Sequence, residues 1–203
     1  MKQQIVRASI AAITLGALSA GSAQAQRFDS LTKAEGVTLG EFERVYIAPV
    51  SVDLVDSEAA FNDGQLNFTR SRLEPPSISE ADQQNNADEL QEDLSRAFGN
   101  RLMLVDAPGE GVLTVDATIT ELIASRPTPD RLRDNPGLDP LSISAGGAAY
   151  FIRLKEEDVS LAEITERDKT SLRDRVPRVR IWQDAERSYG KMARKLSRYV
   201  TRN

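Results

Sequence analysis

The chain has 203 residues, of which 40% are hydrophobic and 28% are charged, and its formal net charge is −5. This composition is typical of a folded globular protein rather than a disordered or fibrous one. The sequence contains no cysteine and no histidine. These two absences exclude disulfide bonds, Ser-His-Asp triads, cysteine nucleophiles and the usual zinc sites, and with them most familiar classes of enzyme.

Residues 1–25 predict a secretory signal peptide. Lys2 and Arg7 precede an apolar stretch over residues 8–20, and the segment closes on GSAQA, which contains an A-x-A cleavage pattern. The apolar stretch is too short to span a bilayer permanently, and an anchor that is never cut is the alternative. We expect Sec export and a periplasmic or secreted protein at the envelope periphery, without a lipid anchor and without a transmembrane segment after cleavage.

The first half of the mature chain alternates strand, loop and helix patterns. Residues 26–40 are polar and predict a flexible lead-in, and apolar residues over 43–54 predict a strand that Pro49 interrupts. Residues 55–85 are rich in turn-forming residues and predict a long loop. An apolar stripe over 86–98, at three- and four-residue spacing, predicts an amphipathic helix.

The second half predicts a sheet closed by a helix. Residues 111–124 alternate apolar and polar side chains, which is typical of a strand covered on one face, and Glu121 falls in phase with the apolar set. We expect Gly109-Glu110-Gly111 to form a hairpin turn before this strand. The other expected elements are a short strand (101–106), a loop (125–140), two strands (148–154 and 159–167) and a closing helix (178–199). The period of 159–167 is ambiguous and also allows a helix, and we favour the strand.

These patterns together predict a single α+β domain over residues 41–203. Its sheet is small, mainly antiparallel or mixed, with about five strands and two main helices packed on it. Long loops are expected near residues 55–85 and 125–140.

Four segments carry a family resemblance: FERVYIAPVSV over 42–52, the helix-strand-turn-strand run over 87–122, Gly146-Gly147-Ala148 opening a hairpin, and a helix starting near Trp182. On these residues the chain resembles the bacterial exported-protein family known as domain of unknown function 3313, whose members are often lipoproteins. The resemblance implies helices on one side of a small mixed sheet and brings no catalytic residues. The lipobox Cys is missing, so acyl anchoring is not carried over. The turn at 155–158 also departs from the family pattern because it lacks glycine.

Two S-x-x-K patterns could supply a nucleophile and its activator: Ser30 with Lys33, and Ser188 with Lys191. The companion motifs of penicillin-recognising enzymes are absent, which favours coincidence. Carboxylates at the start of the long loop could bind a hard cation, with a solvated acidic loop as the alternative. They are Asp53, Asp56, Glu58 and Asp63.

Paired carboxylates can also hydrolyse glycosides if they converge on a cleft. Asp116 and Glu121 on the longest strand, and the acidic tip at 156–158, are the candidates. An exposed sheet face and a turn tip are the alternatives. The sequence predicts no catalytic residue, cofactor site or metal site that stands above such alternatives.

Charge placement is the most distinctive feature of the chain. Residues 167–203 contain 12 basic and four acidic residues, while the preceding part is strongly acidic. The basic segment either docks on the protein's own acidic body or presents a face to an acidic partner or an anionic envelope surface. The residues of this candidate basic interaction face are Arg173, Arg175, Arg178, Arg180, Lys191, Arg194, Lys195 and Arg198.

The hypothesis these observations favour is a non-catalytic exported protein that acts through contacts with an envelope protein or an envelope surface. Two alternatives stay open: a periplasmic carrier of a small ligand, and a hydrolase that uses carboxylates or Ser with Lys. An acidic chain with few aromatic residues is a poor candidate for binding nucleic acid.

Overall fold

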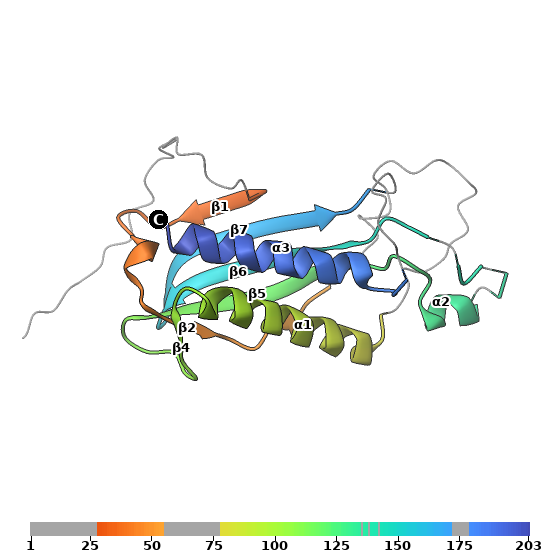
Figure 1. The fold of residues 1–203 in the computed structure, drawn as a ribbon, viewed down its shortest axis with the longest axis horizontal. Coiled ribbons are helices and arrows are strands. Elements are labelled where there is room, and N and C mark those ends of the chain that lie inside the picture. The colour runs from red at the N-terminus through yellow and green to blue at the C-terminus, as the bar shows by residue number, and fades with distance from the viewer. Residues whose placement is uncertain (1–27, 55–77, 135, 138, 142, 172–178) are drawn as a thin grey trace, which may run out of the picture.

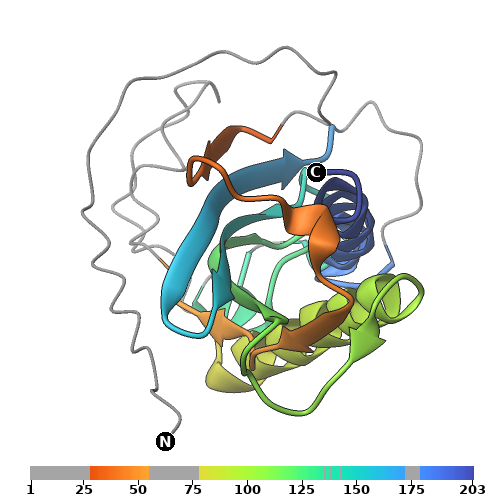
Figure 2. The ribbon, with the colours of Figure 1, turned by 90° about the vertical axis from the view of Figure 1, so that its left-hand side faces the viewer.

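Two helices lie side by side on one face of a curved sheet in the computed structural model (Figures 1 and 2). The structure describes residues 28–54, 78–134, 136–137, 139–141, 143–171 and 179–203. The sheet has seven strands in the order β1-β7-β6-β5-β2-β4, and β3 pairs with β5 beside β2. The α+β class and the two main helices agree with the sequence prediction, and the sheet has more strands than the five or so expected.

The strands run antiparallel from β1 to β5 and parallel from β5 to β4, so the sheet is mixed. Their bounds are β1 Ser30–Lys33, β2 Arg44–Ile47, β3 Ser51–Val52, β4 Met103–Leu104, β5 Val112–Ile123, β6 Gly147–Glu156 and β7 Val159–Lys169. The helices are α1 Glu80–Gly99, the short α2 Pro129–Asp134 and α3 Gln183–Val200, with a 3-10 turn η1 at Leu39–Glu41.

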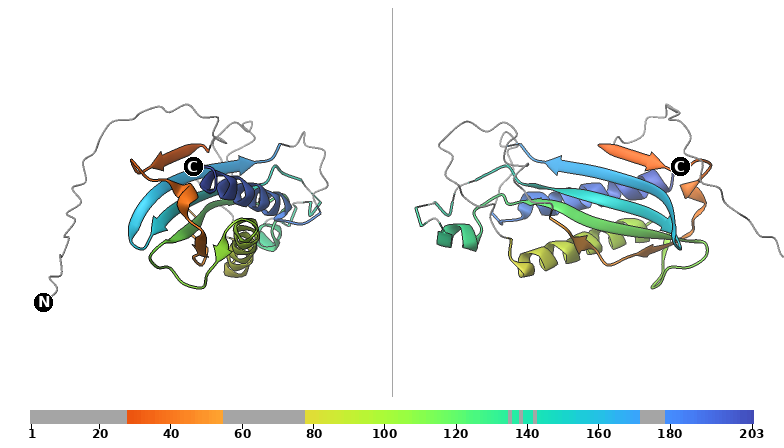
Figure 3. Two further views of the ribbon diagram at one scale, coloured as in Figure 1. Left: turned by 60° about the vertical axis from the view of Figure 1, so that its left-hand side comes forward. Right: turned by 180° about the vertical axis from the view of Figure 1, so that it is seen from behind.

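The core lies between the helices and the sheet. Helix α1 buries the stripe that the sequence predicts, including Leu90, Leu94 and Phe98, and α3 buries Trp182 and Tyr189. Seen from behind, the opposite face of the sheet carries no helix of the described chain (right panel of Figure 3). Ion pairs on this face join Arg153 to Glu163 at 3.3 Å and Lys155 to Asp116 at 2.5 Å. An antiparallel sheet commonly has one face on the core and one face in water.

Segment 26–40 contains structure that the prediction of a flexible lead-in missed. Strand β1 is exposed along its whole length, yet it pairs with β7, and Phe28 beside it is buried. The Phe28 ring packs edge-on against Tyr199 at 5.5 Å, with the Lys195 ammonium 4.5 Å from its centroid. An edge strand held by backbone bonds and one aromatic anchor leaves no hydrophobic period in the sequence.

Helix α1 begins six residues earlier than predicted. Its N-cap is Ser79, whose hydroxyl accepts from the Asp82 backbone N–H at 3.1 Å. Asn86, where the predicted helix begins, is instead buried in the second turn, where its side chain accepts from the Tyr189 hydroxyl at 2.6 Å. The first turns carry almost no apolar residue, so the apolar stripe could not reveal them. The remainder of the predicted 55–85 loop, residues 55–77, lies outside the described residues.

Strand β5 contains a bulge that changes the predicted phase. The register shifts between Ile119 and Glu121, so Leu122 takes the core side and Glu121 turns to the outer face. An extra residue at a bulge reverses the alternation beyond it, because side chains repeat every two residues. The placement of Glu121 with the apolar face was therefore wrong.

The predicted hairpin before β5 was also wrong. Strands β4 and β5 are both parallel to β2 and lie on either side of it, so the turn at 109–111 belongs to a loop that passes the end of β2. The β4 strand is shorter than predicted. The predicted 125–140 loop also contains α2.

Candidate functional site

Helix α3 carries most of the described part of the predicted basic interaction face. Arg180 precedes the helix, and Lys191, Arg194, Lys195 and Arg198 lie within it. The other three members, Arg173, Arg175 and Arg178, lie outside the described residues. We therefore consider the site from α3 and the segments that hold it.

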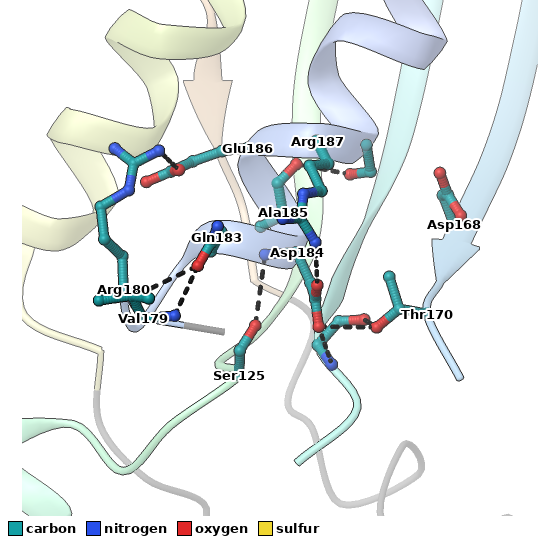
Figure 4. Close-up of polar contacts among 12 residues, drawn as sticks. Ser125, Asp168, Thr170, Val179, Arg180, Gln183, Asp184, Ala185, Glu186 and Arg187 are labelled. Atoms are coloured by element: carbon teal, nitrogen blue, oxygen red, sulfur yellow. Dashed lines mark hydrogen bonds and ion pairs between the residues drawn. The ribbon is translucent and has the colours of Figure 1, made fainter. Parts of the chain in front are cut away.

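The start of α3 is fixed by a buried carboxylate (Figure 4). The Asp184 side chain is fully buried and accepts hydrogen bonds from the Thr170 hydroxyl at 2.8 Å and from the Gly146 backbone N–H at 3.2 Å. It also contacts the Arg187 guanidinium at 3.5 Å. An acid in the first turn of a helix is stabilised by the helix dipole. Asp184 thus joins α3 to the ends of β6 and β7.

Ser125 completes this anchor from a third segment. Its hydroxyl accepts from the Asp184 backbone N–H at 3.3 Å, and its own N–H donates to the Ile181 carbonyl at 2.7 Å. Trp182, the N-cap residue, makes no capping bond with its side chain, so Ser125 takes that role from outside the helix. The sequence carries no signal for this pairing because the two residues are far apart along the chain.

Glycines 146 and 147 allow these segments to approach closely. A Cβ at Gly146 would lie 2.5 Å from the Ser125 hydroxyl, and one at Gly147 would lie 2.1 Å from the Asp168 carbonyl oxygen. The Gly-Gly pair that contributes to the family resemblance therefore serves packing at the start of β6.

The cations of the basic interaction face divide into two groups. Arg180 pairs with Glu186, Lys191 pairs with Asp168 at 3.2 Å, and Lys195 pairs with Glu166 at 2.6 Å. Within the described part of the chain, exposed Arg194 and Arg198 form no ion pair. Lys191, Arg194 and Arg198 follow each other at three- and four-residue spacing, so they share one side of the helix. We call these three residues the α3 basic stripe.

Two carboxylates between α1 and α3 have perturbed ionisation. Burial, followed by the charge of Glu186, raises the pKa of Glu89, while Arg180 opposes the shift. Burial also raises the pKa of Glu186 against the lowering effects of Arg180 and Arg187. Neither glutamate belongs to a motif in the sequence. The sequence does show that each glutamate is adjacent to a residue of the apolar stripe of its helix, which is the signal that could have indicated its partial burial.

The structure does not bring the S-x-x-K pairs together. Ser30 and Lys33 lie on strand β1, where residues three apart point to opposite faces. Ser188 is buried, donates to the Ala185 carbonyl at 2.7 Å and contacts the Tyr150 hydroxyl, whereas Lys191 is turned to Asp168.

The candidate carboxylates of β5 are engaged separately. Asp116 pairs with Lys155 at 2.5 Å, and Glu121 accepts two bonds from Arg167, each at 2.6 Å. In the pairing of β5 with β6, Asp116 lies opposite Arg153 and Glu121 lies opposite Ala149. These two positions are four residues apart on β6, which separates the two carboxylates by about 13 Å along the strand. That exceeds the spacing of glycosidase carboxylates.

The remaining candidates show no shared site. Of the acidic loop set only Asp53 is described, and no cluster of three or more potential metal ligands occurs among the described residues. Glu156 at the hairpin accepts from the Gly111 backbone N–H at 2.9 Å. It lines an open groove of about 350 Å³ with Phe42, Leu161 and Glu41.

A family model described as "Protein of unknown function (DUF3313)" matches residues 21–148. The chain belongs to this family. The match includes three of the four segments that carry the resemblance, and it ends before the helix that starts near Trp182. No curated protein matches this DUF3313 member.

Several solved structures are weakly similar to this DUF3313 protein. The PelC dodecamer from Paraburkholderia phytofirmans shares 7% identity at a TM-score of 0.41, covering 82% of this chain and 97% of that one. Hypothetical protein CT253 from Chlamydia trachomatis shares 14% at 0.40, covering 80% and 99%. Protein XCC0632 from Xanthomonas campestris shares 10% at 0.40, covering 81% and 86%. None of the described helices of the present chain is long and apolar enough to cross a membrane.

Proposed function

We propose that this DUF3313 protein is exported and acts without catalysis in the cell envelope, by binding another macromolecule through the α3 basic stripe. The observation that carries the proposal is the contrast between the two groups of cations. Arg180 and Lys195 are tied to the protein's own acids, while Arg194 and Arg198 are exposed and form no ion pair among the described residues. Both lie on a helix that is anchored at its start. Guanidinium groups held on a fixed element can bind partner carboxylates through two bonds each.

Anchoring of α3 supports the proposal because it makes the stripe a fixed surface. The helix begins on Asp184 and Ser125, and Tyr189 in its second turn donates to Asn86 of α1 at 2.6 Å. Its last turn packs Tyr199 on Phe28. Presenting charges on a pre-organised element reduces the entropy lost on binding.

Export is tested at the N-terminus. We expect Edman or mass-spectrometric sequencing of the protein from the periplasmic or envelope fraction to begin at Gln26. A protein found in the cytosolic fraction with residues 1–25 intact would contradict the proposed location.

Binding is tested by the size of the protein in envelope extracts. The wild type should elute in size-exclusion chromatography ahead of its monomer position, and the double variant Arg194→Glu, Arg198→Glu should elute as the monomer. A matched control is Arg133→Glu, Arg153→Glu, which changes net charge equally at exposed sites on α2 and on the helix-free face of the sheet. A double variant that elutes with the wild type would show that the stripe does not bind.

A further inference from the structure

The outer surface of the helical layer has two ridges of opposite charge. On α1, Asp88 and Glu92 are exposed, with Glu89 and Asp93 partly exposed beside them. Arg96 pairs with Glu92 at 2.5 Å and with Asp93 at 2.7 Å, so the ridge keeps a net negative charge. On α3 the neighbouring ridge is the basic stripe. We call the carboxylates within residues 88–93 the acidic ridge. The basic ridge beside it is the α3 basic stripe.

The two helices that carry the ridges lie side by side and run in the same direction (Figure 1 and left panel of Figure 3). Contacts at both ends fix this direction. Near the helix starts the Trp182 indole N–H donates to Asp82 at 3.1 Å, and near the ends Arg101 donates to Thr201 at 3.5 Å. At the seam Gly190 has no side chain, and Asp93 and Arg194 flank it from either helix.

The mixed charge of this surface selects among partners. An anionic lipid surface would be repelled by the acidic ridge that lies beside the basic one. A protein with an acidic and a basic ridge in the reverse order would find an opposite charge at both positions. A second copy of this chain meets that description when it is related by a two-fold axis parallel to the helices. Helix α1 of each copy then faces α3 of the other, as in a self-complementary dimer.

The size of the surface fits a weak dimer. Helices of 20 and 18 residues are about 30 Å long, and two of them side by side are about 20 Å wide. Contact over this layer would bury about 600 Å² on each copy, or about 1,200 Å² in total, at the lower end of specific interfaces. With charged side chains dominating, the contact should be reversible and sensitive to salt.

We propose that the partner of the α3 basic stripe is the acidic ridge of a second copy of the same chain, in a reciprocal dimer through the helical layer. This inference rests on the proposed function, because it names the partner of the same surface. The proposed dimer contact uses only the helical layer. The charged side chains of the helix-free sheet face pair internally, as Arg153 does with Glu163 and Lys155 with Asp116.

The test is a charge-swap experiment by analytical ultracentrifugation on the purified mature chain. The wild type should show a concentration-dependent dimer at about 0.1 M salt that is lost towards about 1 M, where the Debye length falls from about 10 Å to about 3 Å. Arg194→Glu with Arg198→Glu makes both ridges acidic, and Asp88→Lys with Glu92→Lys makes both basic. Each double variant alone should be monomeric, and an equal mixture of the two should form the dimer again.

Circular dichroism and melting curves establish that each variant is folded, and Arg133→Glu, Arg153→Glu is the control of equal charge change and should stay dimeric. A wild-type chain that remains monomeric at every concentration would overturn the inference, as would a dimer that persists in both double variants. A purified monomer that still elutes in a stripe-dependent assembly from envelope extracts would overturn the second copy as partner and leave the proposed function standing.

Discussion

At the scale of residues, a single polar side chain can bond the backbone groups that lose their partners where a strand is interrupted. The break that Pro49 makes between β2 and β3 leaves backbone groups without ladder partners, and Gln91 of α1 satisfies two of them. Its side-chain amide accepts from the Val50 N–H at 3.0 Å and donates to the Ile47 carbonyl at 3.2 Å. The sequence predicts the interruption, because proline cannot donate to a ladder. It could not indicate the glutamine that fills it, which lies more than 40 residues away.

Replacement of Gln91 should therefore destabilise the fold. Gln91→Met keeps the length of the side chain but leaves both backbone groups unsatisfied, so we expect the free energy of unfolding to fall by about 1–3 kcal/mol. Urea denaturation measures the change. Gln84→Met on the exposed side of the same helix is the control and should change stability by less than about 0.5 kcal/mol. Equal effects of the two changes would contradict the role given to Gln91.

Two glycines should respond to alanine in opposite ways. Gly147→Ala places a Cβ 2.1 Å from a backbone oxygen, which cannot move without breaking the β6–β7 pairing, so we expect a loss of about 3 kcal/mol or more. At Gly190 the nearest atoms are ends of Arg194 and Asp93 side chains at 3.1 and 3.3 Å. Since alanine is favoured over glycine inside a helix, Gly190→Ala should gain up to about 1 kcal/mol. Thermal unfolding compares them, and a stable Gly147→Ala protein would refute the close approach.

At the scale of elements, a partly buried glutamate between α1 and α3 makes the stability of the fold depend on pH. Burial holds the pKa of Glu89 above its ordinary value of 4.5, so the folded state binds a proton more readily than the unfolded state. Stability therefore falls as pH rises from 4.5 through the raised folded value, because the charged form is disfavoured only in the fold.

Glu89→Gln should remove this dependence. We expect the variant to be more stable than the wild type at neutral pH. The difference should shrink as pH falls through the raised folded pKa and disappear below about 4.5, where the carboxyl is protonated in both states. Denaturation curves measured across that pH range give the result. A difference that is constant with pH would show that packing, rather than ionisation, determines the effect.

The elements also show which parts of the fold a sequence pattern can predict. Strands β5 and β6 and the apolar stripes of both helices could be predicted, because burial of one face imposes a period. The period over β7 was ambiguous between strand and helix. Strand β1, the first turns of α1 and the bulge after Ile119 could not be predicted, since they depend on partners distant in the chain. For the site, the excess of basic residues over 167–203 predicted a basic interaction face. Only the structure separates the cations tied to Glu166, Asp168 and Glu186 from the two that are not.

At the scale of the whole molecule, the fold has one face whose charged side chains pair with one another and a second face that carries two separate groups of opposite charge. The helix-free face of the sheet pairs its charges in short ladders, while the helical layer sets an acidic ridge beside a basic one. We propose that this second face contacts another macromolecule in the envelope, and we infer that this macromolecule is a second copy of the chain.

The most direct measurement is site-specific photo-crosslinking in intact cells. A photoreactive residue in place of Arg194, compared with one in place of Arg153 on the helix-free sheet face, reports what lies against each surface. The account predicts a crosslinked product from position 194, with the mass of two chains, and none from position 153. A product from position 194 that contains a different protein would keep the binding role and reject the second copy. Absence of any product from position 194, in cells that contain the folded protein, would contradict the central claim that α3 is a contact surface.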